Sequence, residues 1–205
     1  MPMIEPNESQ KKSDPDTALV QAIQAGDKSL FTDLVQRYEG ALYNFGFKMC
    51  GAVGDAEDLV QETFLNVFRY LNDFRRETKF KNWLYRIAAS VCIKKRRRSK
   101  FAPVRELSLD DFLPGDEADV EQQVPQWAAL PLEQVLNEEL RQKMRAAIWE
   151  LPEKYRAVLV LRDMEGFSTE EAAQILNLTA ANIKVRLHRA RLFLRDQLKD
   201  YFEDA

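Results

Sequence analysis

The sequence predicts an all-helical protein of two small domains joined by a flexible acidic linker, and three observations lead to this prediction. Apolar residues recur every three or four positions in several stretches, which is the spacing of one face of an α-helix. Alternating β-branched runs and Asn-Gly dipeptides, the signals of strands and hairpins, do not occur. A proline-rich, acidic stretch in the middle of the chain shows no helical period, as expected of a linker.

The first domain is expected over residues 16–98, after a disordered tail of residues 1–15, and the linker over residues 99–133. Amphipathic helices of one domain bury their apolar stripes together, so the stripes predict a helical bundle. The stripes are Leu30, Leu34, Tyr38 and Leu42; Val60, Phe64, Val67, Phe68 and Leu71; and Phe80, Leu84, Ile87 and Val91.

The second domain is expected over residues 134–202 and begins with two helices. The first should run from about residue 136 to residue 150. Pro152 starts the second, because proline is well accommodated at the first helical position, and Gly166 ends it.

A helix-turn-helix follows. Ser168 and Glu171 have the spacing of a capping box, which predicts a short helix ending near Leu176. Residues 177–179 form a tight turn, and Thr179 caps a final helix through Asp200. The apolar stripe of this helix is Ile183, Leu187, Ala190 and Leu194. The second helix of such a unit normally enters the major groove of DNA.

The net charge of −3 and the pI near 5.4 hide a strong segregation of charge. Residues 94–105 carry only bases, and residues 106–139 carry only acids. A third block is again purely basic and consists of Lys184, Arg186, Arg189, Arg191 and Arg195. This asymmetry indicates two basic working surfaces joined by an acidic tether.

Several classes of protein are not expected. The chain has no apolar stretch long enough to span a membrane, and its first residues lack the apolar core of a signal peptide, which predicts a cytoplasmic protein. Cys50 and Cys92 lie in apolar helical patterns without ligand spacing, so we expect buried free thiols and neither a metal site nor a disulfide scaffold. No cofactor is expected.

The basic face of the final helix is the first candidate site. Lys184, Arg186 and Arg189 can donate to phosphates or guanine acceptors, and Val185 can contact a thymine methyl group. The alternative is a solvated cationic helix end, but five bases without one acid favour DNA contact. His188 is interpreted as a base or phosphate contact. The candidate duplex contacts are Asn182, Lys184, Val185, Arg186, His188 and Arg189.

The second candidate site is the stretch of residues 74–86, where aromatic and basic residues alternate. This composition suits stacking on unpaired bases together with neutralisation of phosphates. Phe80 and Trp83 are expected in the core. The candidate single-strand contacts are the loop from Arg75 to Lys79 and the outward-facing Asn82, Tyr85, Arg86 and Ser90. The basic run after them is equally well explained as a solvated helix end.

These segments resemble the extracytoplasmic-function sigma factors of bacterial RNA polymerase, which keep only sigma regions two and four. Residues 55–64 (DAEDLVQETF) look like the polymerase-binding helix of that family, and residues 80–88 (FKNWLYRIA) like its promoter-melting segment. Residues 166–173 (GFSTEEAA) and 183–191 (IKVRLHRAR) look like its minus-35-reading region. Each motif is moderately specific, and their order and separation make the set highly specific.

The resemblance implies a role for each surface. Asp58, Gln61 and Glu62 would dock on core polymerase, although a solvated amphipathic face also explains their pattern. Arg75, Arg76, Thr78 and Lys79 would cradle a flipped minus-10 base, while Asn82, Tyr85, Arg86 and Ser90 would hold the displaced strand. The final helix would read the minus-35 element, and the linker would pass near the active-site and RNA-exit channels.

The partners implied are core polymerase, promoter DNA and an anti-sigma factor, which can hold such a factor at the membrane, in a stress or envelope response. No small-molecule substrate is implied. Two departures from the family concern Ser90 and Lys94, which stand where Asn and an acid are frequent, and predict an altered minus-10 preference. A third is Asn177, which replaces a frequent Gly and tolerates left-handed geometry.

Two other functions were weighed. A stand-alone helix-turn-helix regulator should dimerise on palindromic sites, and it leaves the first domain unexplained. A nucleic-acid enzyme needs paired carboxylates, a metal cluster or a phosphate-binding glycine loop, and the sequence has none of these signals. The expected protein is therefore an initiation factor and not an enzyme.

Overall fold

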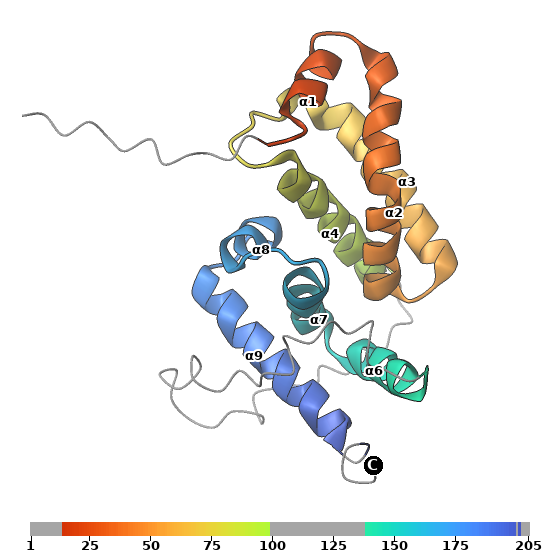
Figure 1. Ribbon diagram of the computed structural model, residues 1–205, viewed down its shortest axis with the longest axis vertical. Helices are drawn as coiled ribbons and strands as arrows, with labels where there is room; N and C mark the ends of the chain where they lie inside the picture. The colour runs from red at the N-terminus through yellow and green to blue at the C-terminus, as the bar shows by residue number, and fades with distance from the viewer. Residues whose placement is uncertain (1–13, 99–137, 200, 202–205) are drawn as a thin grey trace, which may run out of the picture.

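The computed structural model of the chain describes residues 14–98, 138–199 and 201. Within these ranges every regular element is a helix, and the helices form two bundles that pack against each other (Figure 1). This arrangement confirms the all-helical, two-domain prediction. The predicted linker, residues 99–133, and most of the predicted N-terminal tail lie outside the described residues.

The first bundle is built on three long helices. In chain order its elements are α1 (Thr17–Gln24), the short η1 (Lys28–Leu30), α2 (Phe31–Cys50), α3 (Val53–Tyr70), the short η2 (Leu71–Asp73) and α4 (Phe80–Arg98). Leu34, Leu42, Phe80 and Leu84 from the predicted stripes are fully buried between them. Phe68 is an exception, because half of its surface stays exposed while its ring packs edge-on against Phe31.

Two aspartates tie the start of the described chain to this bundle. Asp16 is 1% exposed and accepts hydrogen bonds from Tyr38 and Arg37 of α2. Burial and the adjacent Asp16 raise the pKa of Tyr38, so its phenol stays protonated. Asp14 accepts a 2.6 Å hydrogen bond from the backbone N–H of Phe80 at the start of α4. Asp14 thus provides an acceptor for a backbone N–H group at the start of α4, although it lies far from α4 in sequence.

The second bundle contains α6 (Glu138–Glu150), α7 (Glu153–Leu159), the π-helical turn η6 (Val160–Met164), α8 (Thr169–Leu176) and α9 (Ala180–Gln197). The helix starting after Pro152 was expected to continue unbroken to Gly166. Instead its α-helical part ends at Leu159, and the backbone N–H of Glu165 bonds to Val160, five residues back. The last helix ends at Gln197, slightly before the predicted Asp200.

The local signals of the helix-turn-helix are confirmed. Ser168 and Glu171 form the predicted capping box. The N–H of Glu171 donates to the Ser168 hydroxyl at 3.1 Å, and the N–H of Ser168 donates to the Glu171 carboxylate at 3.0 Å. Asn177 is left-handed, at φ 55° and ψ 50°. Thr179 accepts a 3.2 Å hydrogen bond from the N–H of Asn182 and so caps α9. These contacts orient α9 against α8.

Replacing Asn177 tests the geometry of this turn. The left-handed conformation costs a residue with an ordinary side chain about 1 kcal/mol, whereas glycine adopts it freely. We therefore expect Asn177→Ala to lower the free energy of unfolding by about 1 kcal/mol and Asn177→Gly to leave it nearly unchanged. Urea denaturation followed by circular dichroism measures both. Gln174→Ala, on the exposed face of α8, is the control, and equal stability of the Ala and Gly variants would contradict the assignment.

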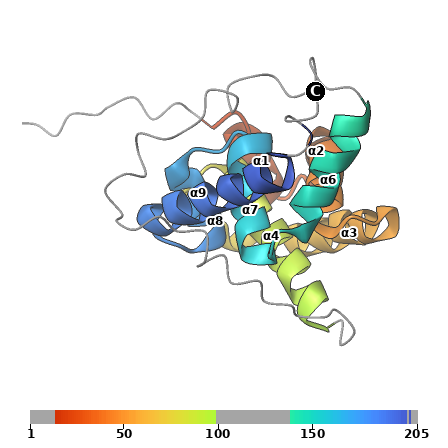
Figure 2. The ribbon, with the colours of Figure 1, turned by 90° about the horizontal axis from the view of Figure 1, so that it is seen from below.

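The two bundles meet mainly where α4 packs against α8 (Figures 1 and 2). A second contact joins the end of α2 to the second bundle, where Lys48 pairs with Glu165 at 2.8 Å. Figure 2 shows that the last turns of α4 project beyond this packed body. Helix α4, which carries the aromatic and basic segment, therefore borders α3 on one side and packs against α8 on another.

Candidate nucleic-acid interface

The acidic helix face consists of Asp58, Gln61 and Glu62, all exposed on α3. Its buried neighbours Leu59 and Phe64 anchor the helix in the core and turn these polar side chains outward. Leu65, 57% exposed, continues the same surface with an unusually open apolar side chain. An exposed mixture of acidic and large apolar side chains on one helix is typical of a protein-binding surface.

A groove runs between α3 and α4, and two predicted sites lie on its opposite walls. The acidic helix face lines the α3 side, whereas Arg86 and Ser90 line the α4 side together with Lys94. Sequence patterns assigned these two sets to different partners and did not predict that they share one groove. A protein bound to the α3 wall therefore lies directly beside any strand held by α4.

The loop between η2 and α4 carries the basic residues expected to cradle a flipped base. Arg75 and Arg76 are exposed, and Arg76 adopts a positive φ of 61°. Thr78 is partly buried, with its hydroxyl 3.4 Å from the carbonyl oxygen of Lys79. The loop therefore presents two arginines to solvent beside Phe74, which packs on Trp83 at 4.9 Å between ring centroids.

The expectation that Tyr85 and Asn82 face outward is wrong for this arrangement of the bundles. Tyr85 is 1% exposed and Asn82 is 5% exposed. The phenol of Tyr85 donates a 2.9 Å hydrogen bond to Glu165, and its ring meets Phe167 edge-on at 4.7 Å. Burial and Glu165 raise the pKa of this phenol. Tyr85 also packs edge-on against Phe45 of α2, at 5.2 Å between ring centroids, so both bundles contribute to its burial.

Ion pairing closes the same contact. Lys79 and Glu171 are 2.8 Å apart, and the buried Asn82 also lowers the pKa of the Glu171 carboxylate. Burial raises the pKa of Glu171, but the hydrogen bonds from Lys79 and Ser168 outweigh it and lower the pKa overall. The Glu171 hydrogen bond and charge raise the pKa of Lys79 in turn. Lys81 places its ammonium group 4.6 Å from the ring centroid of Phe167, a cation–π contact.

Helix α9 presents the other basic surface. Asn182 and Lys184 are exposed in its first turns, and Val185, Arg186 and His188 are partly exposed. The predicted stripe of Ile183, Leu187, Ala190 and Leu194 is buried, which confirms that the basic face is turned outward. This combination of a capped, rigidly packed helix with bases along its outer face suits insertion into a groove of DNA.

Contacts within the second bundle engage part of this basic block. Arg191 makes two hydrogen bonds to Asp163, at 2.9 Å and 2.7 Å, and so holds α9 against η6. Arg189 lies 3.5 Å from the hydroxyl of Tyr155. Burial, Arg191 and Arg195 together lower the pKa of His188 below 6.5, so its imidazole is neutral at pH 7. A neutral imidazole can donate to or accept from a base edge.

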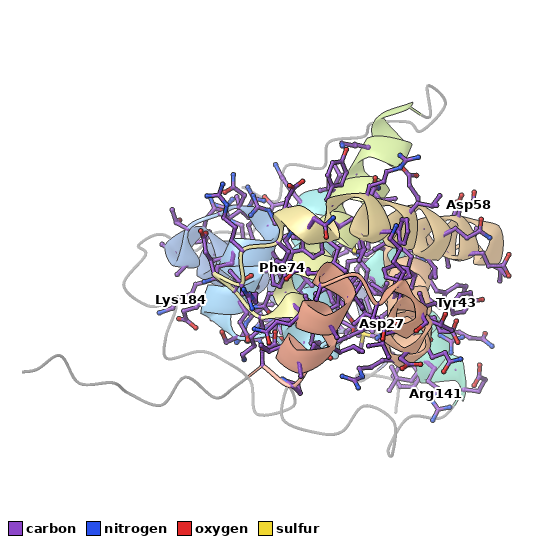
Figure 3. The ribbon with its side chains drawn as sticks, turned by 90° about the horizontal axis from the view of Figure 1, so that it is seen from above. Asp27, Tyr43, Asp58, Phe74, Arg141 and Lys184 are labelled. Carbon is purple, nitrogen blue, oxygen red and sulfur yellow. The ribbon has the colours of Figure 1, made fainter. Side chains whose placement is uncertain are left out.

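The acidic helix face of α3 and the basic face of α9 point in different directions. Figure 3 shows Asp58 on α3 and Lys184 on α9 at opposite sides of the molecule. The loop with Arg75 and Arg76 belongs to neither of these faces. A partner that binds the acidic helix face in this arrangement therefore leaves the basic face of α9 open.

The sequence did not identify Glu165, Phe167 and Glu171 as partners of the first bundle. Glu171 was correctly assigned to the capping box, and the same carboxylate also reaches Lys79, 92 residues away in sequence. The spacing of apolar residues does not predict contacts between distant segments, because each bundle can bury its own apolar stripes without them.

Two observations limit the chemistry of the described residues. They contain no group of three or more His, Cys, Asp or Glu side chains placed to hold a metal ion. None of their helices combines the length and hydropathy needed to cross a bilayer.

A capped helix-turn-helix beside a second helical bundle defines the class of a two-domain DNA-binding protein. Comparison with known families is more specific. Sigma-70 region 2 matches residues 34–101, and Sigma-70 region 4 matches residues 141–194. The ECF RNA polymerase sigma factor SigW of Bacillus subtilis is 34% identical over 182 residues, covering 88% of this chain and 95% of that protein. The chain belongs to the extracytoplasmic-function sigma factors of RNA polymerase.

Other relatives agree with this assignment and confirm the resemblance noted in the sequence. The ECF RNA polymerase sigma-E factor of Escherichia coli K12 is 32% identical over 180 residues, covering 86% of this chain and 90% of that protein. Among solved structures, the sigma factor RpoE of Bartonella quintana, crystallised with the anti-sigma factor NepR, is 26% identical. Its TM-score is 0.60, and the match covers 82% of this chain and 96% of that one.

Proposed function

We propose that this sigma factor binds core RNA polymerase through the acidic helix face and directs initiation at promoters with minus-35 and minus-10 elements. It acts as an initiation factor, so the polymerase supplies the chemistry of RNA synthesis. We also infer a cytoplasmic location, where both polymerase and promoter DNA are found. A stand-alone regulator is not supported, because the match of this chain to sigma factors covers both of its bundles.

The groove between α3 and α4 is the observation that best supports this function. Polymerase on the α3 wall, at Asp58, Gln61 and Glu62, lies next to a DNA strand on the α4 wall, at Arg86 and Ser90. A strand separated from its complement has lost stacking and pairing, and the adjacent basic loop can replace part of that loss. Core binding and strand capture are thereby coupled in space.

We further propose that the two bundles separate before the promoter is melted. Tyr85 and Asn82 touch DNA only after Phe167, Glu165 and Glu171 have moved away from them. The contacts that must break include the partly exposed Lys79–Glu171 ion pair, which is individually weak in water, and the buried packing of Tyr85 on Phe167. Polymerase and promoter DNA drive the separation to the extent that they bind the separated arrangement more tightly than the packed one.

Acid is expected to loosen the bundle contact. The pKa of Glu171 lies below its ordinary value of 4.5, so its contribution is complete above about pH 4.5 and is lost as the pH falls through the lowered value. We expect energy transfer between dyes at the exposed positions 72 and 174 to stay constant down to about pH 5 and to fall below about pH 4.5. Glu171→Gln keeps the capping box and should flatten this change, whereas Glu138→Gln, on α6, should not. An unaltered profile in Glu171→Gln would contradict the assignment.

An anti-sigma factor is the other expected partner. The structural relatives include the sigma factor RpoE of Bartonella quintana in complex with the anti-sigma factor NepR. We propose that a partner of this class controls the present chain. Native co-purification should recover a small inhibitor from unstressed cells, and recovery of polymerase alone under all conditions would contradict this proposal.

Run-off transcription tests the main proposal. The purified chain is added to core polymerase with a pool of promoter fragments from the source genome. Discrete transcripts that need both proteins are expected, and their start sites locate the two promoter elements. A chain that shifts duplex DNA as a dimer, and neither binds core nor starts transcripts, would contradict the proposal.

A further inference from the structure

Cys50 and Cys92 lie side by side in the first bundle. They are the only cysteines of the chain, and neither is in a disulfide. Cys50 is the last residue of α2, and Cys92 lies in α4, with 3.0 Å between the two sulfur atoms. Cys92 is 2% exposed, whereas Cys50 is partly exposed at the helix end. The sequence predicted buried free thiols and gave no sign that they would meet.

We propose that Cys50 and Cys92 are a reversible modification site, at which a hydroperoxide or a low-molecular-weight disulfide closes a bond between α2 and α4. This inference does not depend on the proposed function. A bond between the only two cysteines has a single intramolecular connectivity, so no competing pairing exists within the chain. Sulfur atoms in a disulfide lie about 2.04 Å apart, so closure needs a shift of roughly 1 Å.

The two thiols have different surroundings. Cys50 is the last residue of α2 and is followed by Gly51, which caps the helix in the left-handed region at φ 77° with its N–H bonded to the Phe47 carbonyl. Cys92, in contrast, is fixed within α4 between buried neighbours. The more accessible thiol thus lies at a helix end, and the buried thiol lies within a helix. An oxidant reaches Cys50 first, and Cys92 acts as the resolving thiol.

The reaction with hydrogen peroxide balances in two steps. The Cys50 thiolate attacks one peroxide oxygen, the O–O bond breaks, and Cys50 sulfenic acid and one water molecule form. The Cys92 thiolate then attacks the sulfenic sulfur, and the second oxygen leaves as water once it has taken up a proton. Two thiols have lost two electrons and two protons to the peroxide. A dithiol reductant reverses the reaction through a mixed disulfide.

The bond would join two regions with different neighbours. Trp149 of α6 packs directly on Gly51, since a Cβ at that glycine would lie 1.6 Å from the indole. Val91, next to Cys92, lines the groove between α3 and α4. Oxidation therefore fixes the end of α2 to α4 between the contact with the second bundle and the groove.

Intact mass and thiol titration of the full chain test the site. In glutathione redox buffers the folded chain should lose both thiols together, fall in mass by two hydrogen atoms and remain monomeric. Native geometry should shift this equilibrium about tenfold or more towards the disulfide relative to the chain in urea. By linkage, the oxidised chain should melt at a Tm higher by about 5 °C or more.

Cys50→Ser and Cys92→Ala serve as controls. Cys50 is partly exposed, so we expect Cys50→Ser to fold normally. Neither variant can show the coupled loss of two thiols or the rise in Tm on oxidation. The proposal is overturned if the folded wild-type chain takes two independent glutathione adducts or forms dimers through intermolecular bonds. It is also overturned if the disulfide forms only in urea.

Discussion

Reversing two charges on α9 should abolish transcription from promoters that need a minus-35 element. In Lys184→Glu/Arg186→Glu, two side chains proposed to donate to DNA become repulsive to it. Each lost contact of this kind costs about 1–3 kcal/mol, so together they should lower transcript yield about 100-fold or more. Run-off transcription at a fixed, moderate salt concentration measures the loss.

The double variant must keep its fold and its polymerase affinity for this result to be specific. Lys184 is exposed and Arg186 is partly exposed, so the core of the second bundle is unaffected. Arg145→Glu, an equally exposed reversal on α6, is the control and should transcribe normally. Normal yield from the double variant would contradict the assignment of α9 to the minus-35 element.

Reversal on the acidic helix face should prevent assembly with polymerase. Asp58→Arg/Glu62→Arg changes two exposed carboxylates that we propose face core polymerase, and opposed like charges cost several kcal/mol at an interface. A loss of about 3 kcal/mol corresponds to an affinity lower by about 100-fold. Fluorescence titration of labelled chain with core polymerase measures it.

Glu57→Arg is a matched control for this experiment. Glu57 is exposed on the same helix and has the same charge, but it does not line the groove between α3 and α4. Its reversal should change the affinity for core polymerase little. If Glu57→Arg weakened binding by half as much as the double variant, the effect would follow net charge, and the assignment of the acidic helix face would be wrong.

The sequence predicted the helices, the capping box and the left-handed Asn177 because each depends on residues within one or two turns of each other. The stripe from Ile183 to Leu194 likewise specifies which face of α9 is buried. Helix ends were less accurate. The π-helical turn after Leu159, with backbone bonds from Glu165 to Val160 and from Phe167 to Leu161, was not predicted because apolar spacing does not distinguish it from an α-helical turn.

The environment of Tyr85 and Asn82 could not be predicted for a related reason. A helical wheel places both on the outer side of the first bundle, but the ring of Tyr85 packs on Phe45 of α2 as well as on the second bundle. Their actual neighbours, Phe167 and Glu171, lie about eighty to ninety residues further along the chain. Loop closure over such a distance leaves no periodic signal, and the same limit hid the approach of Cys50 to Cys92.

The most direct test of this account measures the distance between the bundles during initiation. Dyes at the exposed positions 72 and 174, in a Cys50→Ser/Cys92→Ser background, report it by energy transfer in the free chain, with core polymerase, and with polymerase and promoter. We predict high transfer in the free chain and a clear fall once polymerase and promoter are bound. High transfer in a complex that makes transcripts would contradict the account, because Tyr85 and Asn82 would then stay covered by the second bundle.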